Sequence, residues 1–363
     1  MTNIVVDAHQ DIAWNYFNNG RDFGLSAWEK RRREASRPTL LKHYGYSMCG
    51  LPEALLGRVA VIGSTIYAAP AHAAMYSDEI ITYDTPQAAY EWGLRQLGYY
   101  QQLAETHEHL ILVRTQADLD TVLASWGPGC TLADHRVGLI VLMEGADPIL
   151  EPAQVEEWYE RGLRIVGPAW TATRYAGGTG APGPLTDMGR ELLEAMASFG
   201  MVLDLSHLTP DGWIEAVDRY EGPVFASHAN PLRFRPDAPN RNPSDDMIMR
   251  LAERDGVLGI IPFNLFLKSG WRKGDRKNAA CMDDVIAAID HVCQLTGSAR
   301  HVGIGSDFDG GFGSESAPLE FETTADLLAL GPALAGRGYA PEDVAAILSD
   351  NFLRVLRAGL PGE

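Results

Sequence analysis

Short, strongly apolar runs alternate with longer amphipathic segments along the chain. The apolar runs are rich in Val, Ile and Leu and predict eight strands, at Ile4–Asp7, Val59–Tyr67, Val137–Met143, Leu163–Ala169, Met201–Leu205, Val224–Ser227, Val257–Phe263 and Val302–Ser306. They are largely apolar on both faces, which is typical of parallel strands that are covered on both sides. The amphipathic segments space apolar residues by three and four and predict helices at Ala88–Thr106, Pro152–Arg161, Thr186–Phe199, Pro210–Tyr220, Ser244–Asp255, Met282–Thr296 and Thr324–Ala335.

This alternation predicts a (β/α)8 TIM barrel, formed as a single domain by residues 1–363. Such a barrel typically takes about 250 residues, and an open doubly wound sheet is the competing architecture. The surplus length lies mainly in Asn15–Leu56, a polar segment that is expected to be a long loop inserted after the first strand. Loops of this length often act as lids over a site. A second flexible loop is expected at Tyr175–Pro184, whose glycines match no phosphate-binding motif.

Composition excludes several classes of partner. The chain has 48 acidic and 30 basic residues, a formal net charge of −18, whereas phosphate contacts need clustered Lys and Arg, so no nucleic-acid partner is expected. No apolar run approaches the roughly 18 residues of a membrane span, and the N-terminus lacks the basic stretch and apolar core of a signal peptide. We therefore expect a cytoplasmic protein with no membrane partner. The four cysteines form no CxxC pair and are expected to be free thiols.

Polar side chains with metal-binding chemistry follow five of the predicted strands. They are His9 and Asp11 after the first strand, Glu144 after the third, His207 after the fifth, His228 after the sixth and Asp307 after the eighth. In a barrel of this type the carboxyl ends of the strands meet at one face, where active sites are assembled. Imidazole nitrogens and carboxylate oxygens are suitable zinc ligands.

Each of these residues also has an ordinary structural interpretation. A single histidine at a strand end is commonly hydrogen-bonded, and a single acid often caps the next helix. Several buried acids and imidazoles at one barrel face are costly without a cation, so their combination favours a metal site. The barrel is therefore predicted to be of the metal-dependent hydrolase type.

Motifs spread over nearly the whole chain resemble the membrane (renal-type) dipeptidase family, peptidase family M19. They are Asp7–Asp11, Glu144–Gly145, Leu185–Arg190, Asp204–His207, Ala226–His228, Arg241–Asp246, Gly303–Gly310 and Asn351–Leu353, and they occur in the family's order. The opening HxD at His9 and Asp11 is distinctive, because the broader amidohydrolase relatives usually begin with HxH.

The resemblance implies two zinc ions as the cofactor. The first would be held by His9, Asp11 and Glu144, and the second by His207 and His228, with Glu144 bridging the two. A shared anion suits such a pair because it offsets the repulsion between two dications. A hydroxide that bridges the metals would be the nucleophile, since zinc lowers the pKa of bound water to about 7.

The resemblance also assigns catalytic and substrate-binding positions, with two departures. Asp307 matches the family's catalytic acid, and Arg241 matches the arginine that holds the substrate's terminal carboxylate, a task that suits a guanidinium fork. Where the family usually has a histidine that contacts the scissile carbonyl, this chain has Trp170. Where the family has a tyrosine after the seventh strand, this chain has Asn264.

Either Arg174 or Tyr175, close after the tryptophan, is a candidate to compensate for the missing histidine. The metal-binding half of the site thus follows the family pattern, whereas the carbonyl-binding half differs from it.

Three hypotheses of function follow. The first is a metallodipeptidase that cleaves dipeptides, including those with a D-residue at the C-terminal side. The sequence leaves the oligomeric state open, and the resemblance implies a homodimer as one possibility. The second keeps the two zinc ions but acts on another small amide, such as an N-acyl amino acid or a cyclic amide, and is motivated by Trp170. The third is a non-catalytic barrel that binds metal or a small ligand, against which the retained Asp307 argues.

Overall fold

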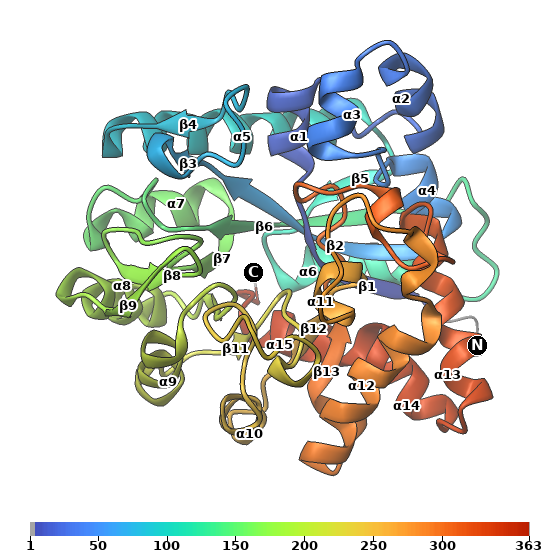
Figure 1. The fold of residues 1–363 in the computed structure, drawn as a ribbon. Coiled ribbons are helices and arrows are strands. Elements are labelled where there is room, and N and C mark those ends of the chain that lie inside the picture. The colour runs from blue at the N-terminus through green and yellow to red at the C-terminus, as the bar shows by residue number, and fades with distance from the viewer. Residues whose placement is uncertain (1–3, 363) are drawn as a thin grey trace.

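Eight parallel strands form a nearly closed barrel in the computed structural model, which describes residues 4–362 (Figure 1). The strands are β1 (Val5–Gln10), β2 (Val59–Tyr67), β6 (Val137–Glu144), β7 (Leu163–Gly167), β10 (Val202–Asp204), β11 (Val224–Phe225), β12 (Leu258–Ile260) and β13 (Val302–Ile304). Their order is β11-β10-β7-β6-β2-β1-β13-β12, and a parallel bridge between Ala226 and Leu258 brings the two ends together. The predicted (β/α)8 barrel is confirmed, with all eight strands near their expected positions. Residues 1–3, the start of the N-terminal segment that lacks a signal-peptide pattern, lie outside the described residues. Glu363 lies outside them as well.

The longest strands are β2 and β6, which pair in register from Val61 opposite Gly138 to Tyr67 opposite Glu144. Every residue of both strands is buried. Helices cover the outside of the barrel while side chains fill its interior, so apolar residues are favoured on both faces. This burial explains why the continuous apolar runs identify the strands.

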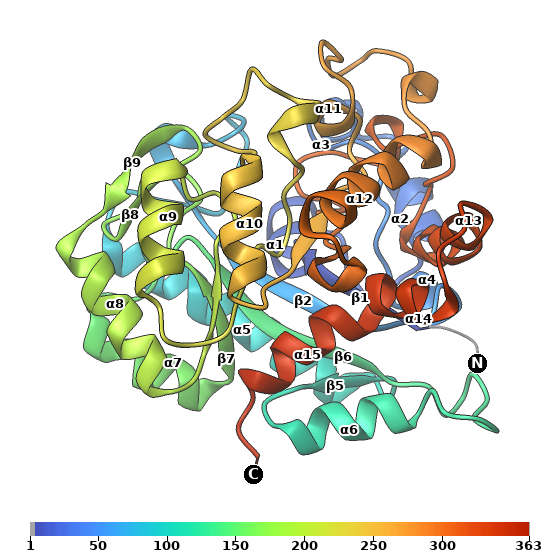
Figure 2. The same cartoon turned by 90° about the horizontal axis from the view of Figure 1, so that it is seen from below.

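Helices surround the strands, and α8, α9, α10 and α12 follow one another along one side (Figure 2). The outer helices are α5 (Pro86–Thr106), α6 (Gln116–Ala124), α7 (Val155–Arg161), α8 (Asp187–Ser198), α9 (Pro210–Arg219), α10 (Asp245–Glu253), α12 (Met282–Thr296), α13 (Leu330–Gly336), α14 (Pro341–Ala345) and α15 (Asn351–Ala358). Capping residues fix two of the starts. The Thr186 hydroxyl accepts from Gly189 N before α8, and the Ser244 hydroxyl accepts from Met247 N before α10.

The segment after the first strand is helical, which corrects the expectation of a long loop at Asn15–Leu56. It forms α1 (Ile12–Asn19), α2 (Ala27–Glu34), α3 (Pro38–Tyr44) and α4 (Leu51–Leu56). The buried Arg21 guanidinium lies 2.8 Å from Glu34 and 3.6 Å from Asp309. Asp309 also accepts hydrogen bonds from Ser47 Oγ and from the backbone N–H groups of Met48 and Cys49. These contacts attach the helices to the segment that follows β13.

A second correction concerns Tyr175–Pro184, where a flexible loop was expected. This region contains a short antiparallel hairpin of β8 (Ala176–Gly178) and β9 (Ala181–Leu185). The sequence pattern also did not predict β5 (Leu110–Leu112). This strand pairs with the first residues of β6, and β7 pairs with the residues of β6 that follow them. The remaining short elements are β3 (Ala69–Pro70), β4 (Thr82–Tyr83) and α11 (Asn264–Leu267).

Two further sequence expectations can be compared with the structure. All four cysteines are free, as predicted. Among residues 4–362, no helix combines the length and apolar character that crossing a bilayer requires.

Barrel closure gives a stability prediction at Gly305, directly after β13. A Cβ at this position would lie 1.7 Å from the Ser227 carbonyl oxygen. Gly305→Ala is therefore expected to lower the free energy of unfolding by at least about 2 kcal/mol, as overpacking in a core does. The control is Gly98→Ala in α5, where a Cβ meets open space and helix propensity favours alanine by roughly 0.5–1 kcal/mol. Equal urea midpoints for the two variants would contradict this explanation of barrel closure.

Candidate metal centre

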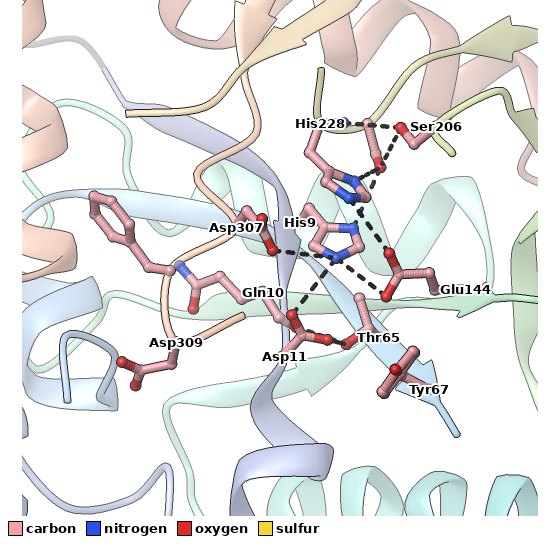
Figure 3. A network of polar contacts seen from close by, with 12 residues as sticks. His9, Gln10, Asp11, Thr65, Tyr67, Glu144, Ser206, His228, Asp307 and Asp309 are labelled. Atoms are coloured by element: carbon pink, nitrogen blue, oxygen red, sulfur yellow. Dashed lines mark hydrogen bonds and ion pairs between the residues drawn. The ribbon is translucent and has the colours of Figure 1, made fainter. Parts of the chain in front are cut away.

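The structure brings together all six side chains that the strand ends predict. Figure 3 shows five of them, labelled His9, Asp11, Glu144, His228 and Asp307, turned toward one another. His9 belongs to β1 and Glu144 is the last residue of β6, while the others follow β1, β10, β11 and β13. All lie at the carboxyl ends of parallel strands. They are buried apart from Asp307, which is partly exposed.

Glu144 lies between a pair of histidine nitrogens and a second group formed by His9 and two carboxylates. Its Oε1 is 3.1 Å from His207 Nε2 and 3.3 Å from His228 Nε2, and these two nitrogens are 3.0 Å apart. Zinc ligands at about 2.0–2.2 Å in a tetrahedron are separated by roughly 3.3–3.6 Å. The three atoms are thus spaced closely enough for a small expansion to accommodate one metal ion.

The other oxygen of Glu144 faces a second group. Glu144 Oε2 lies 3.7 Å from His9 Nε2, which is also 3.7 Å from Asp11 Oδ2 and 3.9 Å from Asp307 Oδ1. His9 Nε2 is buried and has no hydrogen-bond partner. A buried polar nitrogen without a partner, surrounded by carboxylates, fits a metal ligand. His9, Asp11 and Asp307 together, and His9, Glu144 and His228 together, could each hold an ion.

Burial dominates the electrostatics of this site. It raises the pKa of Glu144 well above its usual range and raises the pKa of Asp307 to about 7, and the Asp11 carboxylate adds to both shifts. Burial also lowers the pKa of His9, but Glu144, Asp11 and Asp307 outweigh it and bring the value to about 10. Burial disfavours the charged form of these neighbouring carboxylates. A divalent cation bound between them would stabilise that charged form.

The two remaining imidazoles are kept neutral. Burial lowers the pKa of both His207 and His228 well below the usual range, and Arg241 and His9 add to the shift. Neutral imidazole is the form that binds metal ions.

Outer hydrogen bonds orient these imidazoles. His207 Nδ1 lies 2.8 Å from Thr179 Oγ1, which comes from the turn between β8 and β9. His228 Nδ1 lies 2.8 Å from Ser227 Oγ, which donates to Asp204 Oδ2 at 2.5 Å. Such outer partners fix the tautomer and direction of a metal-binding histidine.

Ser227 allows a test of these outer contacts, since it also lies 3.3 Å from His9 Nδ1. Ser227→Ala is expected to weaken metal binding by about 10- to 100-fold, the usual effect of removing such a partner. Competition with a chelator measures this loss. Ser198→Ala, which removes a hydroxyl from the exposed side of α8, is the matched control and should bind metal as the parent does. Parental affinity in Ser227→Ala would show that the serine orients neither imidazole.

Three residues near the site have positive φ without being glycine. His207 has φ 66°, Asp307 has φ 55° and Asp309 has φ 66°. This left-handed region is uncommon for such residues, and strained backbone of this kind concentrates at functional sites. Asp309 accepts three hydrogen bonds from Ser47–Cys49, which help to hold the strained segment that carries Asp307.

Sequence reasoning missed several residues that support the site. The Thr65 hydroxyl donates to Asp11 Oδ1 at 2.6 Å, and Asp7 accepts from both the backbone and the hydroxyl of Ser306. Thr179 and Tyr67 also escaped notice. Thr65 and Tyr67 are in the apolar run of β2, two residues apart and so on the same face of the strand, and strand periodicity could therefore have indicated them together. Nothing in the local pattern identifies Thr179.

Two of the residues expected to bind substrate lie beside the metal-binding groups. The buried Arg241 donates to the His228 carbonyl oxygen at 3.0 Å. The Trp170 ring is 6.3 Å from the His207 ring and 5.0 Å from the Tyr67 ring, between centroids. Both residues line the cavity over the metal-binding groups, which has a volume of about 130 Å³.

The structure does not bring Arg174 and Asn264 into this cavity. The Arg174 guanidinium lies 3.2 Å from Asp147 Oδ1 and donates to the carbonyl oxygens of Asp147, Ile149 and Leu150. These four interactions hold the loop after β6, and Arg174 is not among the residues that line the cavity. Asn264 is buried and donates to the Lys277 carbonyl oxygen, while its neighbours Phe263 and Phe266 line the cavity instead.

A second, more apolar chamber of about 380 Å³ adjoins the first. The two share Trp170, His207, Arg241 and Phe266. Ala73, Ala238 and Leu265 add apolar surface to the chamber, Arg235 adds a second guanidinium, and no carboxylate lines it. Charge is therefore divided, with acidic groups at the metal end and basic groups at the chamber.

A (β/α)8 barrel with histidines and carboxylates at its strand ends is the architecture of metal-dependent hydrolases. The family model described as membrane dipeptidase, peptidase family M19, matches residues 1–359. The chain therefore belongs to peptidase family M19.

Individual relatives agree with this membership. An uncharacterized dipeptidase of Schizosaccharomyces pombe is 31% identical over 69% of this chain and 63% of its own length. Dipeptidase aclJ of Aspergillus oryzae is 30% identical over 61% of this chain and 51% of its own length. The match thus spans less than two thirds of each of these two proteins.

Solved structures share the fold. A metallo peptidase from Rhodobacter sphaeroides, liganded with a phosphinate mimic of the dipeptide L-Ala-D-Ala, has a TM-score of 0.77 at 22% identity over 99% of this chain and 100% of that chain. The probable dipeptidase PvdM from Pseudomonas aeruginosa has a TM-score of 0.79 at 17% identity over 99% and 96% of the two chains.

Proposed function

We propose that this protein is a metallodipeptidase that hydrolyses the amide bond of dipeptides with two zinc ions as its cofactor. One observation carries the proposal: one oxygen of Glu144 faces the Nε2 atoms of His207 and His228, and the other oxygen faces His9 Nε2. His9 and Asp11 would hold one ion, His207 and His228 the other, and Glu144 both. Zinc bound there would supply a hydroxide nucleophile near neutral pH by lowering the pKa of coordinated water to about 7.

The chain's own residues account for the remaining steps. Asp307 would accept the proton of the attacking water and deliver it to the departing amine nitrogen as the C–N bond breaks. Its carboxylate lies at the edge of the metal-binding groups, 3.9 Å from His9, and it also faces the cavity. Arg241 would bind the terminal carboxylate of the substrate and so hold the scissile carbonyl near Glu144.

A panel of L,L and L,D dipeptides offered to the zinc-loaded protein tests this function. We expect release of free amino acids from several members. Dipeptides with an amidated C-terminus are the control, because they lack the charge that Arg241 would bind, and their kcat/KM should fall at least about 10-fold. Failure to cleave any dipeptide in the panel would reject the proposal.

The apolar chamber gives a prediction about selectivity. The leaving residue would extend from Arg241 toward Phe266, Leu265 and Trp170, where a large apolar side chain buries surface. We expect kcat/KM for dipeptides ending in Leu or Phe to exceed that for dipeptides ending in Gly by about 10-fold or more. Competition assays with paired substrates measure the ratio directly. Equal rates, or a preference for C-terminal Asp or Glu, would mean that the chamber does not receive this side chain.

Trp170 favours one alternative within the same chemistry, an amidase that acts on N-acyl amino acids. The acyl chain of such a substrate has no amino group that the protein must bind. Its terminal carboxylate would bind Arg241 as that of a dipeptide would. Trp170→His distinguishes the two possibilities. A large gain in dipeptide hydrolysis by this variant, with loss of N-acyl amino acid hydrolysis, would favour the alternative.

A further inference from the structure

Tyr67 carries a buried hydroxyl that has no hydrogen-bond partner among residues 4–362. It is the last residue of β2 and pairs in register with Glu144 of β6. The side chain is 4% exposed, and its hydroxyl has no hydrogen bond. Buried phenol hydroxyls are normally satisfied, so an unsatisfied one beside a metal-binding glutamate calls for a ligand as its partner.

The surroundings of Tyr67 favour a ligand oxygen. The residue lines the cavity over the metal-binding groups together with Glu144, Asp11 and Asp307. A phenol with an ordinary pKa of about 10 is protonated at neutral pH, so the Tyr67 hydroxyl is available as a hydrogen-bond donor.

The ring is also held rigidly. The backbone N–H and C=O of Tyr67 both bond to the Gln96 side chain, at 3.1 and 2.7 Å. Trp170 packs edge-on against the ring at 5.0 Å and Trp14 at 6.2 Å, with interplanar angles of 72° in both cases. Figure 3 shows Tyr67 on the same side of the site as Thr65, Asp11 and Glu144. A donor fixed in this way costs little reorganisation when charge develops next to it.

We propose that the Tyr67 hydroxyl donates a hydrogen bond to the scissile carbonyl oxygen and stabilises the negative charge that develops on it. This inference rests on the proposed amide hydrolysis. As the nucleophile bonds to the carbonyl carbon, the C=O π electrons move to the oxygen, which accepts the hydrogen bond without taking the proton. When the tetrahedral carbon collapses, the C–N bond breaks and Asp307 protonates the nitrogen. Trp170 supports the Tyr67 ring edge-on.

The test compares Tyr67→Phe with the zinc-loaded parent. We expect kcat to fall about 10²- to 10³-fold with KM changed by less than about threefold, as for loss of one oxyanion donor. A phosphinate dipeptide analogue, whose phosphorus is tetrahedral, should lose affinity by the same factor as kcat/KM. Zinc content should equal that of the parent, and the melting temperature should stay the same or rise, because no hydrogen bond of the folded protein is lost.

Tyr220→Phe is the matched control. The Tyr220 hydroxyl is buried at the end of α9 and donates to the Met201 carbonyl oxygen at 2.5 Å, away from the metal-binding groups. This variant should show the opposite result, a lower melting temperature with unchanged kcat.

Several outcomes would overturn the assignment of Tyr67. They are a kcat within threefold of the parent, unchanged phosphinate affinity, a loss of zinc, or a lower melting temperature. If the parent cleaves no dipeptide, the proposed function fails on its own, and phosphinate affinity alone decides the role of Tyr67. A parent that binds no phosphinate rejects the role, whereas binding that Tyr67→Phe weakens supports it.

Discussion

Glu144→Gln should abolish both metal binding and hydrolysis. The substitution keeps the size of the side chain but removes the charge that two cations would share, and it replaces one ligand oxygen with an amide nitrogen. Zinc content should fall from about two per chain to less than one, since a neutral amide is a poor ligand for this cation. Activity should fall at least about 10³-fold, because metal catalysis contributes several kcal/mol and each 1.36 kcal/mol is tenfold in rate.

Glu79→Gln is the control for this result. Glu79 is also a buried carboxylate near the cavity, but it accepts from Trp14 Nε1 and the Met75 backbone and has no histidine partner. It should retain the zinc content of the parent. If Glu144→Gln kept two zinc ions, the assignment of Glu144 as the shared ligand would be wrong.

Asp307→Asn should separate catalysis from metal binding. Asp307 lies at the edge of the histidine and carboxylate groups, and its proposed task is to carry a proton between water and the departing amine. Losing that group should reduce kcat by about 10²- to 10⁴-fold, the usual contribution of general acid–base catalysis. Zinc content should remain about two per chain, because His9, Asp11 and Glu144 complete their group without it.

The zinc content of this variant also resolves an ambiguity in the geometry. His9, Asp11 and Asp307 lie close enough together to hold an ion by themselves. If Asp307→Asn lost zinc in parallel with activity, Asp307 would be a ligand and not a proton carrier. Unchanged activity would remove it from both roles.

The strands could be predicted because each one is buried on both faces. In β2 and β6 every residue is enclosed, so an unbroken apolar run marks each strand. The candidate ligands could be predicted for a related reason. A polar residue that directly follows such a run, such as Glu144 after Met143, must lie at the face of the barrel where the carboxyl ends of the strands meet.

Other features depend on contacts between distant parts of the chain. The polar sequence of Asn15–Leu56 predicts a loop. In the folded chain, however, Arg21 is buried and forms ion pairs with Glu34 and Asp309, and the sequence alone does not indicate these pairs. The same holds for Thr179, which reaches His207 from a glycine-rich hairpin. Tertiary context outweighs local pattern in both cases.

Arg174 illustrates the limit of reasoning from spacing alone. It follows Trp170 closely and carries a charge suited to a developing oxyanion, yet its guanidinium bonds to three backbone carbonyl oxygens and Asp147. Tyr67 shows the reverse case, since it stands within an apolar strand and its unsatisfied hydroxyl emerges only from the packing. The carbonyl-binding group that we propose would thus come from β2, and not from the position after β7 that the family resemblance indicates.

If Glu144 binds two zinc ions, anomalous scattering at the zinc absorption edge from crystals grown with zinc will locate both of them. We expect two peaks about 3.5–4 Å apart, as in other two-metal sites. One peak should lie within bonding distance of His9 and Asp11, the other within bonding distance of His207 and His228, and each should contact one oxygen of Glu144. A single peak, or two peaks that do not share Glu144, would contradict this arrangement.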